Sequence, residues 1–225
     1  MFLSRLTFNT RSSLARRHLA QPYELHRTLL KGFPEGGVHM PRSDPEAHGV
    51  LYRVEKHPVL QSPYALVQSV REPDWSLLTA MRDDGHQPFL LTPPECRPFS
   101  PDVEAGKIYA FRLRANPTKR LSATRKRVGF YREEDQLLWL YRRLRSLDFF
   151  AEDEQPAAVH ILQAFVSKEG DITDRVHQHD ITLTSIQFNG FLEIIDPASV
   201  LTLIRNGVGS AKGFGFGLLS LRRAG

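Results

Sequence analysis

The chain has 225 residues, of which 41% are hydrophobic and 24% are charged, and its formal net charge at pH 7 is +5. This length allows one large domain or two small ones, and the composition excludes wholesale disorder, collagen and coiled coil. A single cysteine, Cys96, excludes an internal disulfide framework and a multi-cysteine zinc site, and it favours a reducing compartment. No apolar run reaches the roughly 18 residues that span a bilayer, and residues 1–21 lack the apolar stretch of a secretory signal. We therefore expect a cytoplasmic protein.

The first half of the chain predicts the element order βαββαβ. Apolar residues at period two indicate a strand over 1–8, and a helix follows over 13–30 with a break at Pro22, because proline is costly inside a helix. A loop rich in glycine and proline covers 32–49. Two strands, a short helix and a weak last strand are then predicted at 51–55, 65–70, 74–81 and 88–91.

Four prolines between residues 93 and 101 predict a linker. The predicted domains are therefore an N-terminal domain over 1–92 and a C-terminal domain over 106–225, joined by a linker over 93–105.

The second half predicts the same order again. A strand at 107–114 precedes a helix at 132–147, whose first turn is acidic and whose last turns are basic. Two strands follow, and the second of them is expected to bend or break at Gly190; a helix then starts at the cap Asp196 and stops at Gly207. The strands are predicted at 159–166, 181–195 and 216–221. The fold class is therefore α+β, with two tandem ferredoxin-like (βαββαβ, RRM-like) domains, and this fold by itself assigns no function.

Basic residues are concentrated between residues 106 and 132. This segment has nine of them and no acidic residue, while the rest of the chain is net negative. Its first part alternates as a strand does, which disfavours a membrane-binding amphipathic helix and favours nucleic acid as the polyanionic partner. The nine are Lys107, Arg112, Arg114, Lys119, Arg120, Arg125, Lys126, Arg127 and Arg132.

The segment 206–219 has five glycines within eleven residues. One interpretation is a helix stop with a flexible turn; the other, which we favour, is a bare backbone whose amide groups contact RNA phosphates with help from Lys212. The segment matches neither the dinucleotide-binding nor the Walker pattern, and KGFGF at 212–216 matches only the start of the RNA-recognition-motif signature. The residues expected to contact RNA here are Gly207, Gly209, Ser210, Lys212, Gly213 and Gly215.

Tyr23 and His26 are three residues apart in the first helix and can share one face of it. A histidine can take the proton of a ribose 2′-OH or give one to the leaving oxygen, and a tyrosine can position that proton. A nearby lysine can stabilise charge that develops on phosphorus. These groups suit RNA cleavage by internal transesterification, which needs no metal because the substrate carries its own nucleophile.

Two other kinds of site are less well supported. His177, His179 and Asp180 could hold a metal, with Asp171 and Asp174 nearby, but GDITDRVHQHD at 170–180 reads as a polar turn between strands and lacks the spacing of strong zinc motifs. Serine hydrolase chemistry is not supported either, because the chain has no GxSxG elbow.

Four segments resemble the CasE-type CRISPR RNA-processing endoribonucleases, which are subunits of the type I-E Cascade complex. They occur in the family's order and extend over nearly the whole chain. The segments are PYELHRTLLKGFP, LYRVE, FRLRANPTKR with KRVGFYREEDQLLWL, and GVGSAKGFGFGLLSL.

This resemblance implies a metal-independent endoribonuclease without a cofactor. It would bind the stem-loop of CRISPR repeat RNA and cut the precursor to leave cyclic phosphate and 5′-hydroxyl ends. It would then stay bound to the guide RNA, with the other Cascade subunits as its protein partners. His26 would be the principal catalytic residue, with Tyr23 and, less firmly, Lys31 assisting. Residues 112–127 would form a hairpin on the RNA stem. The RNA contacts would then include Arg27, Arg112, Arg114, Lys119, Arg120, Arg125, Lys126 and Arg127.

The competing hypothesis is a non-catalytic RRM-like RNA-binding module. In that case KGFGF would stack bases and His26 would have no chemical role.

Overall fold

The computed structural model describes residues 1–33, 49–122, 127–147, 157–176 and 179–224. The chain divides into two compact units. Unit 1 comprises Met1–Ser100 together with Lys212–Gly215, and unit 2 comprises Pro101–Ala211 together with Phe216–Gly225.

Unit 1 is built on a four-stranded antiparallel sheet in the order β2-β3-β1-β4. Its strands are β1 (Phe2–Thr7), β2 (Leu51–Lys56), β3 (Pro63–Ser69) and β4 (Glu95–Pro98). Its helices are α1 (Ser13–Ala20), α2 (Pro22–Leu30), α3 (Ser76–Ala80) and the short 3-10 turn η1 (Lys212–Phe214). The order βαββαβ is thus present, and the break predicted at Pro22 divides the first helix into α1 and α2.

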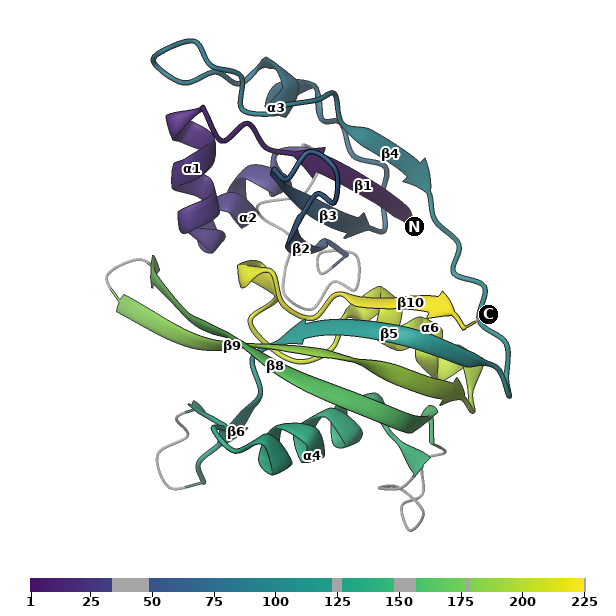
Figure 1. Ribbon diagram of the computed structural model, residues 1–225. Coiled ribbons are helices and arrows are strands. Elements are labelled where there is room, and N and C mark those ends of the chain that lie inside the picture. The colour runs from purple at the N-terminus through teal and green to yellow at the C-terminus, as the bar shows by residue number, and fades with distance from the viewer. Residues whose placement is uncertain (34–48, 123–126, 148–156, 177–178, 225) are drawn as a thin grey trace. The chain divides into compact units, whose positions relative to one another are not determined.

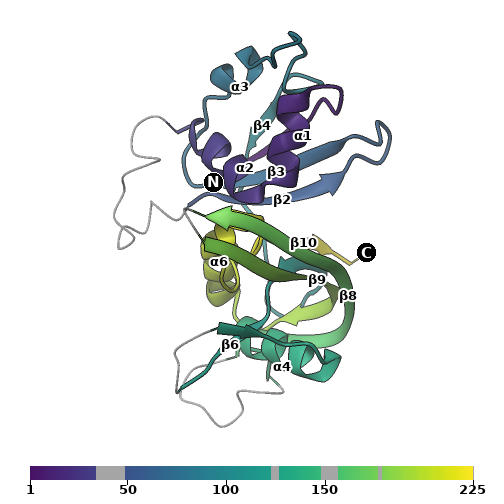
Figure 2. The same ribbon diagram turned by 90° about the vertical axis from the view of Figure 1, so that its left-hand side faces the viewer.

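The core of unit 1 lies between one face of this sheet and the helices. Leu6 of β1 and Val67 of β3 point inward, and Leu25 and Leu29 of α2 are buried against them. Figures 1 and 2 show α1 and α2 together on one face of the sheet. The apolar face of α2 is therefore used by the core, and its remaining faces are available for chemistry.

Unit 2 repeats this topology with the sheet order β10-β5-β9-β8, again antiparallel. Its strands are β5 (Ile108–Ala115), β8 (Val159–Val176), β9 (His179–Ile194) and β10 (Leu219–Arg223). Helix α4 (Glu133–Leu144) packs against β8, and α6 (Pro197–Asn206) packs against β10. The tandem ferredoxin-like prediction is confirmed. The capping prediction also holds, because the Asp196 carboxylate accepts hydrogen bonds from the amides of Ala198 and Ser199.

Strands β8 and β9 are longer than predicted, and Figure 2 shows them as a long curved ribbon. Residues 170–176, predicted to be a turn, belong to β8. Beyond the reach of β5, and among the residues that the structure describes, the two strands pair only with each other. Asp171 and Thr173 of this ribbon are exposed and Asp174 is buried, so polar residues there belong to a strand and do not mark a turn.

Strand β9 continues through Gly190, where a bend or break was predicted. A Cβ at residue 190 would lie 2.0 Å from the Gln163 carbonyl oxygen and 2.8 Å from Phe111 Cε1. Opposite it, the pairing register of β8 shifts between Ile161 and Gln163, which is a bulge. This glycine therefore allows close approach of a neighbouring strand.

The predicted linker contains a strand. Residues 88–91, predicted to be the last strand of the first domain, form isolated bridges, Phe8↔Leu90 and Arg82↔Pro88, and β4 pairs with β1 instead. Prolines in this segment suggested a linker, but Pro98 ends an edge strand, where a missing amide hydrogen is tolerated. Unit 1 accordingly extends to Ser100 rather than to residue 92.

A small hairpin is inserted between β5 and α4. It pairs β6 (Thr118–Arg120) with β7 (Arg127–Gly129) outside the main sheet.

The last strand of unit 2 starts later than predicted. Residues 212–214 form η1, and β10 starts at Leu219 rather than at residue 216. Among the described residues, no helix has the length and apolar character needed to cross a membrane.

Candidate functional site

The candidate site is built on one face of α2. Pro22 occupies the first helical position, where its missing amide hydrogen costs nothing. Tyr23 and His26 follow at a spacing of three residues and therefore share a face, as predicted. Both side chains are half-buried, whereas the core side of the helix is fully buried.

The turn η1 packs against this face of α2 within unit 1. The ring of Phe214 stacks on that of Tyr23, with centroids 5.7 Å apart and planes at 29°. A Cβ at residue 213 would lie 3.1 Å from His26 Cδ2, so glycine permits the backbone to lie directly against the imidazole. The turn therefore contacts both side chains that the sequence nominated for chemistry.

His26 is held in a neutral state. Burial lowers its pKa from 6.5 to about 4, because a charged imidazolium loses hydration there. Within the described residues its Nδ1 atom is buried and has no hydrogen-bond partner. At neutral pH the imidazole therefore carries one unprotonated ring nitrogen that can accept a proton.

The turn η1 also contributes a lysine. Lys212 is the first residue of η1 and precedes Gly213, which lies against His26. It is half-buried, and burial lowers its pKa. Lys31, the predicted assistant, is exposed at the end of α2. It follows His26 by five residues, or about 140° around the helix, so it leaves α2 on another face. Arg27 is exposed and forms an ion pair with Glu24 at 3.0 Å.

Sequence reasoning missed Tyr52, although it lies within the segment LYRVE. It is buried on β2, and its ring is stacked parallel to that of His26, with centroids 6.0 Å apart and planes at 14°. No local pattern could have identified it, because the packing of β2 with η1 and α2 is a tertiary contact.

The glycines of segment 206–219 are largely explained by contacts within the protein. Hypothetical Cβ atoms at Gly209 and Gly215 would lie 2.9 Å from the Trp139 ring and 3.2 Å from the Tyr52 ring, respectively. The backbone that was predicted to be bare for RNA is thus closely covered by aromatic side chains at these positions. Positive φ angles further require glycine at Gly207, Gly209, Gly215 and Gly217. Contact of Ser210 and the remaining residues of this segment with RNA stays a prediction.

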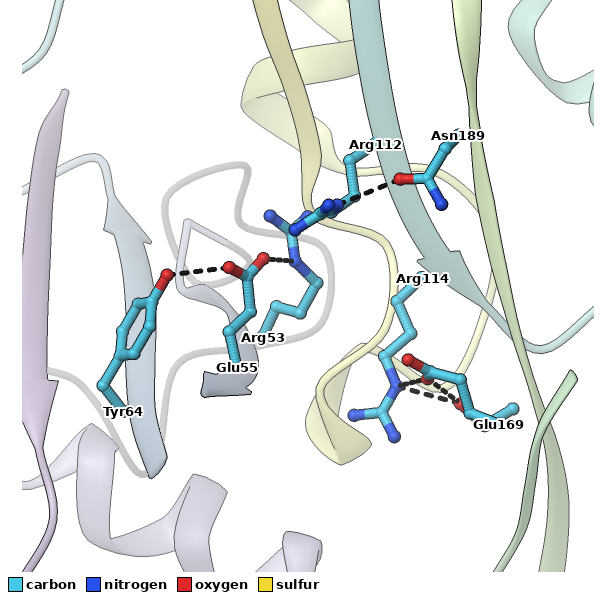
Figure 3. Close-up of polar contacts among 8 residues, drawn as sticks. Arg53, Glu55, Tyr64, Arg112, Arg114, Glu169 and Asn189 are labelled. Carbon is cyan, nitrogen blue, oxygen red and sulfur yellow. Dashed lines mark hydrogen bonds and ion pairs between the residues drawn. The ribbon is translucent and has the colours of Figure 1, made fainter. Parts of the chain in front are cut away.

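The predicted basic residues fall into two groups within unit 2. Arg112 and Arg114 lie on the sheet face of β5 opposite its buried residues, where Arg112 bonds Asn189 Oδ1 at 3.0 Å and Arg114 pairs with Glu169 at 2.6 Å (Figure 3). Lys119, Arg120 and Arg127 are exposed on the β6–β7 hairpin. Arg125 and Lys126 lie outside the described residues.

Two other histidines, His18 and His57, have structural roles. His18 Nδ1 bonds the Leu14 carbonyl at 2.8 Å, and the ring packs edge-on against Phe89. His57 Nδ1 accepts from two backbone amides in a turn. His177, a member of the metal site considered from the sequence, lies outside the described residues. Among the described residues, no three or more histidine, cysteine, aspartate or glutamate side chains are grouped so that they could hold a metal ion.

Comparisons with known proteins identify related sequences and structures over nearly the whole chain. The model of the family described as "CRISPR associated protein" matches residues 1–223. The CRISPR-associated endoribonuclease Cse3 of Thermus thermophilus is 39% identical, over 98% of this chain and 99% of that protein. The CRISPR system Cascade subunit CasE of Escherichia coli K12 is 27% identical, over 92% and 95%. Among solved structures, Thermus thermophilus Cse3 bound to an RNA representing a pre-cleavage complex has a TM-score of 0.76 at 35% identity, over 98% of both chains.

The lowered pKa of His26 predicts how stability depends on pH. The pKa of His26 is 6.5 in the unfolded chain and about 4 in the folded chain, so between these pH values the unfolded chain binds a proton that the folded chain does not. The free energy of unfolding should therefore fall as pH decreases through this window, by at most about 2 kcal/mol between pH 8 and pH 5. Urea unfolding of the wild type and of His26→Gln at several pH values isolates this contribution, because all other groups are shared. Parallel pH profiles for the two proteins would contradict it.

Proposed function

The chain belongs to the CRISPR associated protein family, and we propose that it is an endoribonuclease that cuts precursor CRISPR RNA at the repeat stem-loop and stays bound to the guide RNA in Cascade. The observation that carries the chemistry is the neutral, partly buried imidazole of His26, packed against Gly213 beside Tyr23. An imidazole in this state is unprotonated at neutral pH and can therefore accept a proton as a general base.

The reaction we propose is an internal transesterification. His26 takes the proton of the ribose 2′-OH, and the 2′-oxygen forms a bond to the adjacent phosphorus. The bond from phosphorus to the 5′-oxygen breaks, and the protonated His26 gives its proton to this oxygen, so the products are a cyclic phosphate and a 5′-hydroxyl end. Tyr23 positions the reacting group, and Lys212 rather than Lys31 supplies positive charge for the phosphorane.

RNA affinity resides mainly in unit 2 in this proposal. The β6–β7 hairpin presents three exposed cations, Lys119, Arg120 and Arg127, and β5 adds Arg112. An A-form stem hides its base edges in a deep major groove, so these groups would recognise backbone and shape rather than sequence. Such a substrate is a transcript, which fits the expected cytoplasmic location.

The binding-module alternative is disfavoured by Phe216. In an RNA recognition motif the aromatic residues of this signature lie exposed on a strand and stack bases. Here the matching residues form η1 and the segment after it, and Phe216 is fully buried beneath the guanidinium of Arg114 at 5.5 Å. Phe214 is already stacked on Tyr23. KGFGF therefore supports the catalytic helix instead of binding bases.

The first test concerns the nucleophile. A labelled repeat hairpin should be cut in the presence of a chelator, and the upstream product should carry a cyclic phosphate. Replacing the 2′-OH at the cleavage site by hydrogen should abolish cutting and leave binding nearly unchanged, because one hydroxyl contributes little to the affinity of a long RNA. Cutting of the deoxy-substituted RNA, or a strict need for divalent ions, would contradict the mechanism.

The second test concerns His26. General acid–base catalysis by one positioned side chain is typically worth about a hundred- to ten-thousand-fold in rate. His26→Ala should therefore lose about that much in single-turnover cleavage while RNA affinity changes by only a few-fold. His160→Ala, a substitution of another half-buried histidine in unit 2, is the matched control and should cut normally. A His26→Ala protein that cuts at the wild-type rate would refute the assignment.

The third test separates affinity from chemistry. Changing Lys119, Arg120 and Arg127 to alanine should weaken RNA binding and flatten its salt dependence, by up to about 0.9 in the slope of log K against log salt for each phosphate that the protein no longer neutralises. Cleavage at saturating RNA should largely recover. A control with the same change in charge replaces three exposed helix residues, Arg142, Arg143 and Arg205. Equal salt slopes for the two variants would place the RNA elsewhere.

A further inference from the structure

The geometry points to Tyr52 as a positioning residue for the cleavage reaction: it fixes the start of α2 and the turn η1 around the imidazole of His26. This inference rests on the proposed function, in which His26 is the catalytic base. Tyr52 would not touch the substrate, and it would act through His26.

The hydroxyl group of Tyr52 lies between the backbone carbonyls of Pro22 and Gly213. It lies 2.7 Å from the Pro22 carbonyl, to which it donates, and 3.4 Å from the Gly213 carbonyl. Pro22 is the first residue of α2, and Gly213 is the middle residue of η1. One side chain from β2 therefore links the beginning of the catalytic helix to the turn that packs on it.

The ring of Tyr52 determines where the imidazole can lie. The two rings are stacked nearly parallel, and Gly215 lies so close that its Cβ would be 3.2 Å from Tyr52 Cε2. Because Gly213 also lies directly against His26, the imidazole meets both the tyrosine ring and the turn. Aromatic stacking and close backbone contact together restrict rotation of His26 about its side-chain bonds.

Core packing alone does not explain a tyrosine at this position. Tyr52 is only 1% exposed, and phenylalanine would fill the same volume without burying a hydroxyl group that needs a partner. The Pro22 and Gly213 carbonyls that this hydroxyl meets both belong to catalytic elements. What the hydroxyl adds beyond the ring is therefore the placement of α2 and η1 relative to each other.

Tyr64 provides a matched control in the same sheet. It lies on β3, next to β2, and its hydroxyl donates to Glu55 Oε2 at 2.7 Å, while Glu55 also pairs with Arg53 (Figure 3). Tyr64→Phe thus removes a hydrogen bond of the same length from the same unit, and this bond involves neither α2 nor η1.

The experiment compares Tyr52→Phe, Tyr64→Phe, His26→Ala and the wild type on the repeat hairpin. Misplacement of a catalytic group by about 1 Å can cost up to a hundredfold in rate, so we expect Tyr52→Phe to lose about ten- to a hundredfold in single-turnover cleavage at saturating RNA. Its RNA dissociation constant should stay within about threefold of the wild type. Tyr64→Phe should cut at nearly the wild-type rate.

A second readout does not depend on cleavage. The His26 ring Cε1–H resonance, assigned by its absence in His26→Ala, should shift in Tyr52→Phe and titrate closer to an ordinary histidine, because a loosened site admits water. The same resonance should be unchanged in Tyr64→Phe.

The outcomes separate the two ideas. If Tyr52→Phe cuts like the wild type, if Tyr64→Phe loses as much rate, or if the loss in Tyr52→Phe only tracks its unfolded fraction, the positioning role is wrong. If instead His26→Ala cuts normally, the proposed base is wrong and the positioning role fails with it. A selective loss in Tyr52→Phe, with the shifted His26 resonance, supports the inference.

Discussion

The candidate site depends on one contact, the packing of the turn η1 on the exposed face of α2. The turn reaches unit 1 from far along the chain, since Lys212–Gly215 belongs to that unit while its neighbours on both sides belong to unit 2. Close approach to the His26 ring is possible because residue 213 has no side chain. Burial by such packing is also what lowers the pKa of His26. The same contact therefore creates the geometry of the site and its electrostatics.

The proposed function places chemistry and RNA affinity in different parts of the chain. The β6–β7 hairpin and β5 of unit 2 carry exposed cations, whereas the α2 site holds a neutral histidine and a half-buried lysine. A neutral base beside a polyanion has a physical advantage, because nearby phosphates would otherwise favour the protonated imidazole. Burial opposes that effect, so the base can stay unprotonated when RNA is bound.

The sequence was sufficient for local features and insufficient for distant ones. Alternation and capping predicted both βαββαβ orders, the break at Pro22 and the cap at Asp196, because these depend on neighbouring residues. Composition gave wrong predictions in two places. Polar residues at 170–176 were interpreted as a turn but belong to β8, and the prolines after residue 92 were interpreted as a linker although this segment contains the edge strand β4. The helix spacing placed Tyr23 and His26 on one face, but it gave no indication that Tyr52 lies beside them. The assisting role of Lys31 stays a prediction, and no local pattern indicated that η1, which begins at Lys212, packs on α2.

In each unit a glycine lies against an aromatic ring of a helix, but the ring differs in chemistry between the two units. In unit 2, Gly209 lies against the ring of Trp139 on α4, a ring that also stacks on Phe188 and belongs to the core. In unit 1, Gly213 lies against the ring of His26 on α2, and that ring keeps a buried nitrogen that has no partner among the described residues. An unsatisfied buried polar atom costs about 1–3 kcal/mol, a penalty that a phenylalanine at residue 26 would avoid. Packing therefore explains why an aromatic ring meets the glycine in each unit, but it does not explain the imidazole. Such a cost is expected at a functional site, which agrees with the base role that we propose for His26.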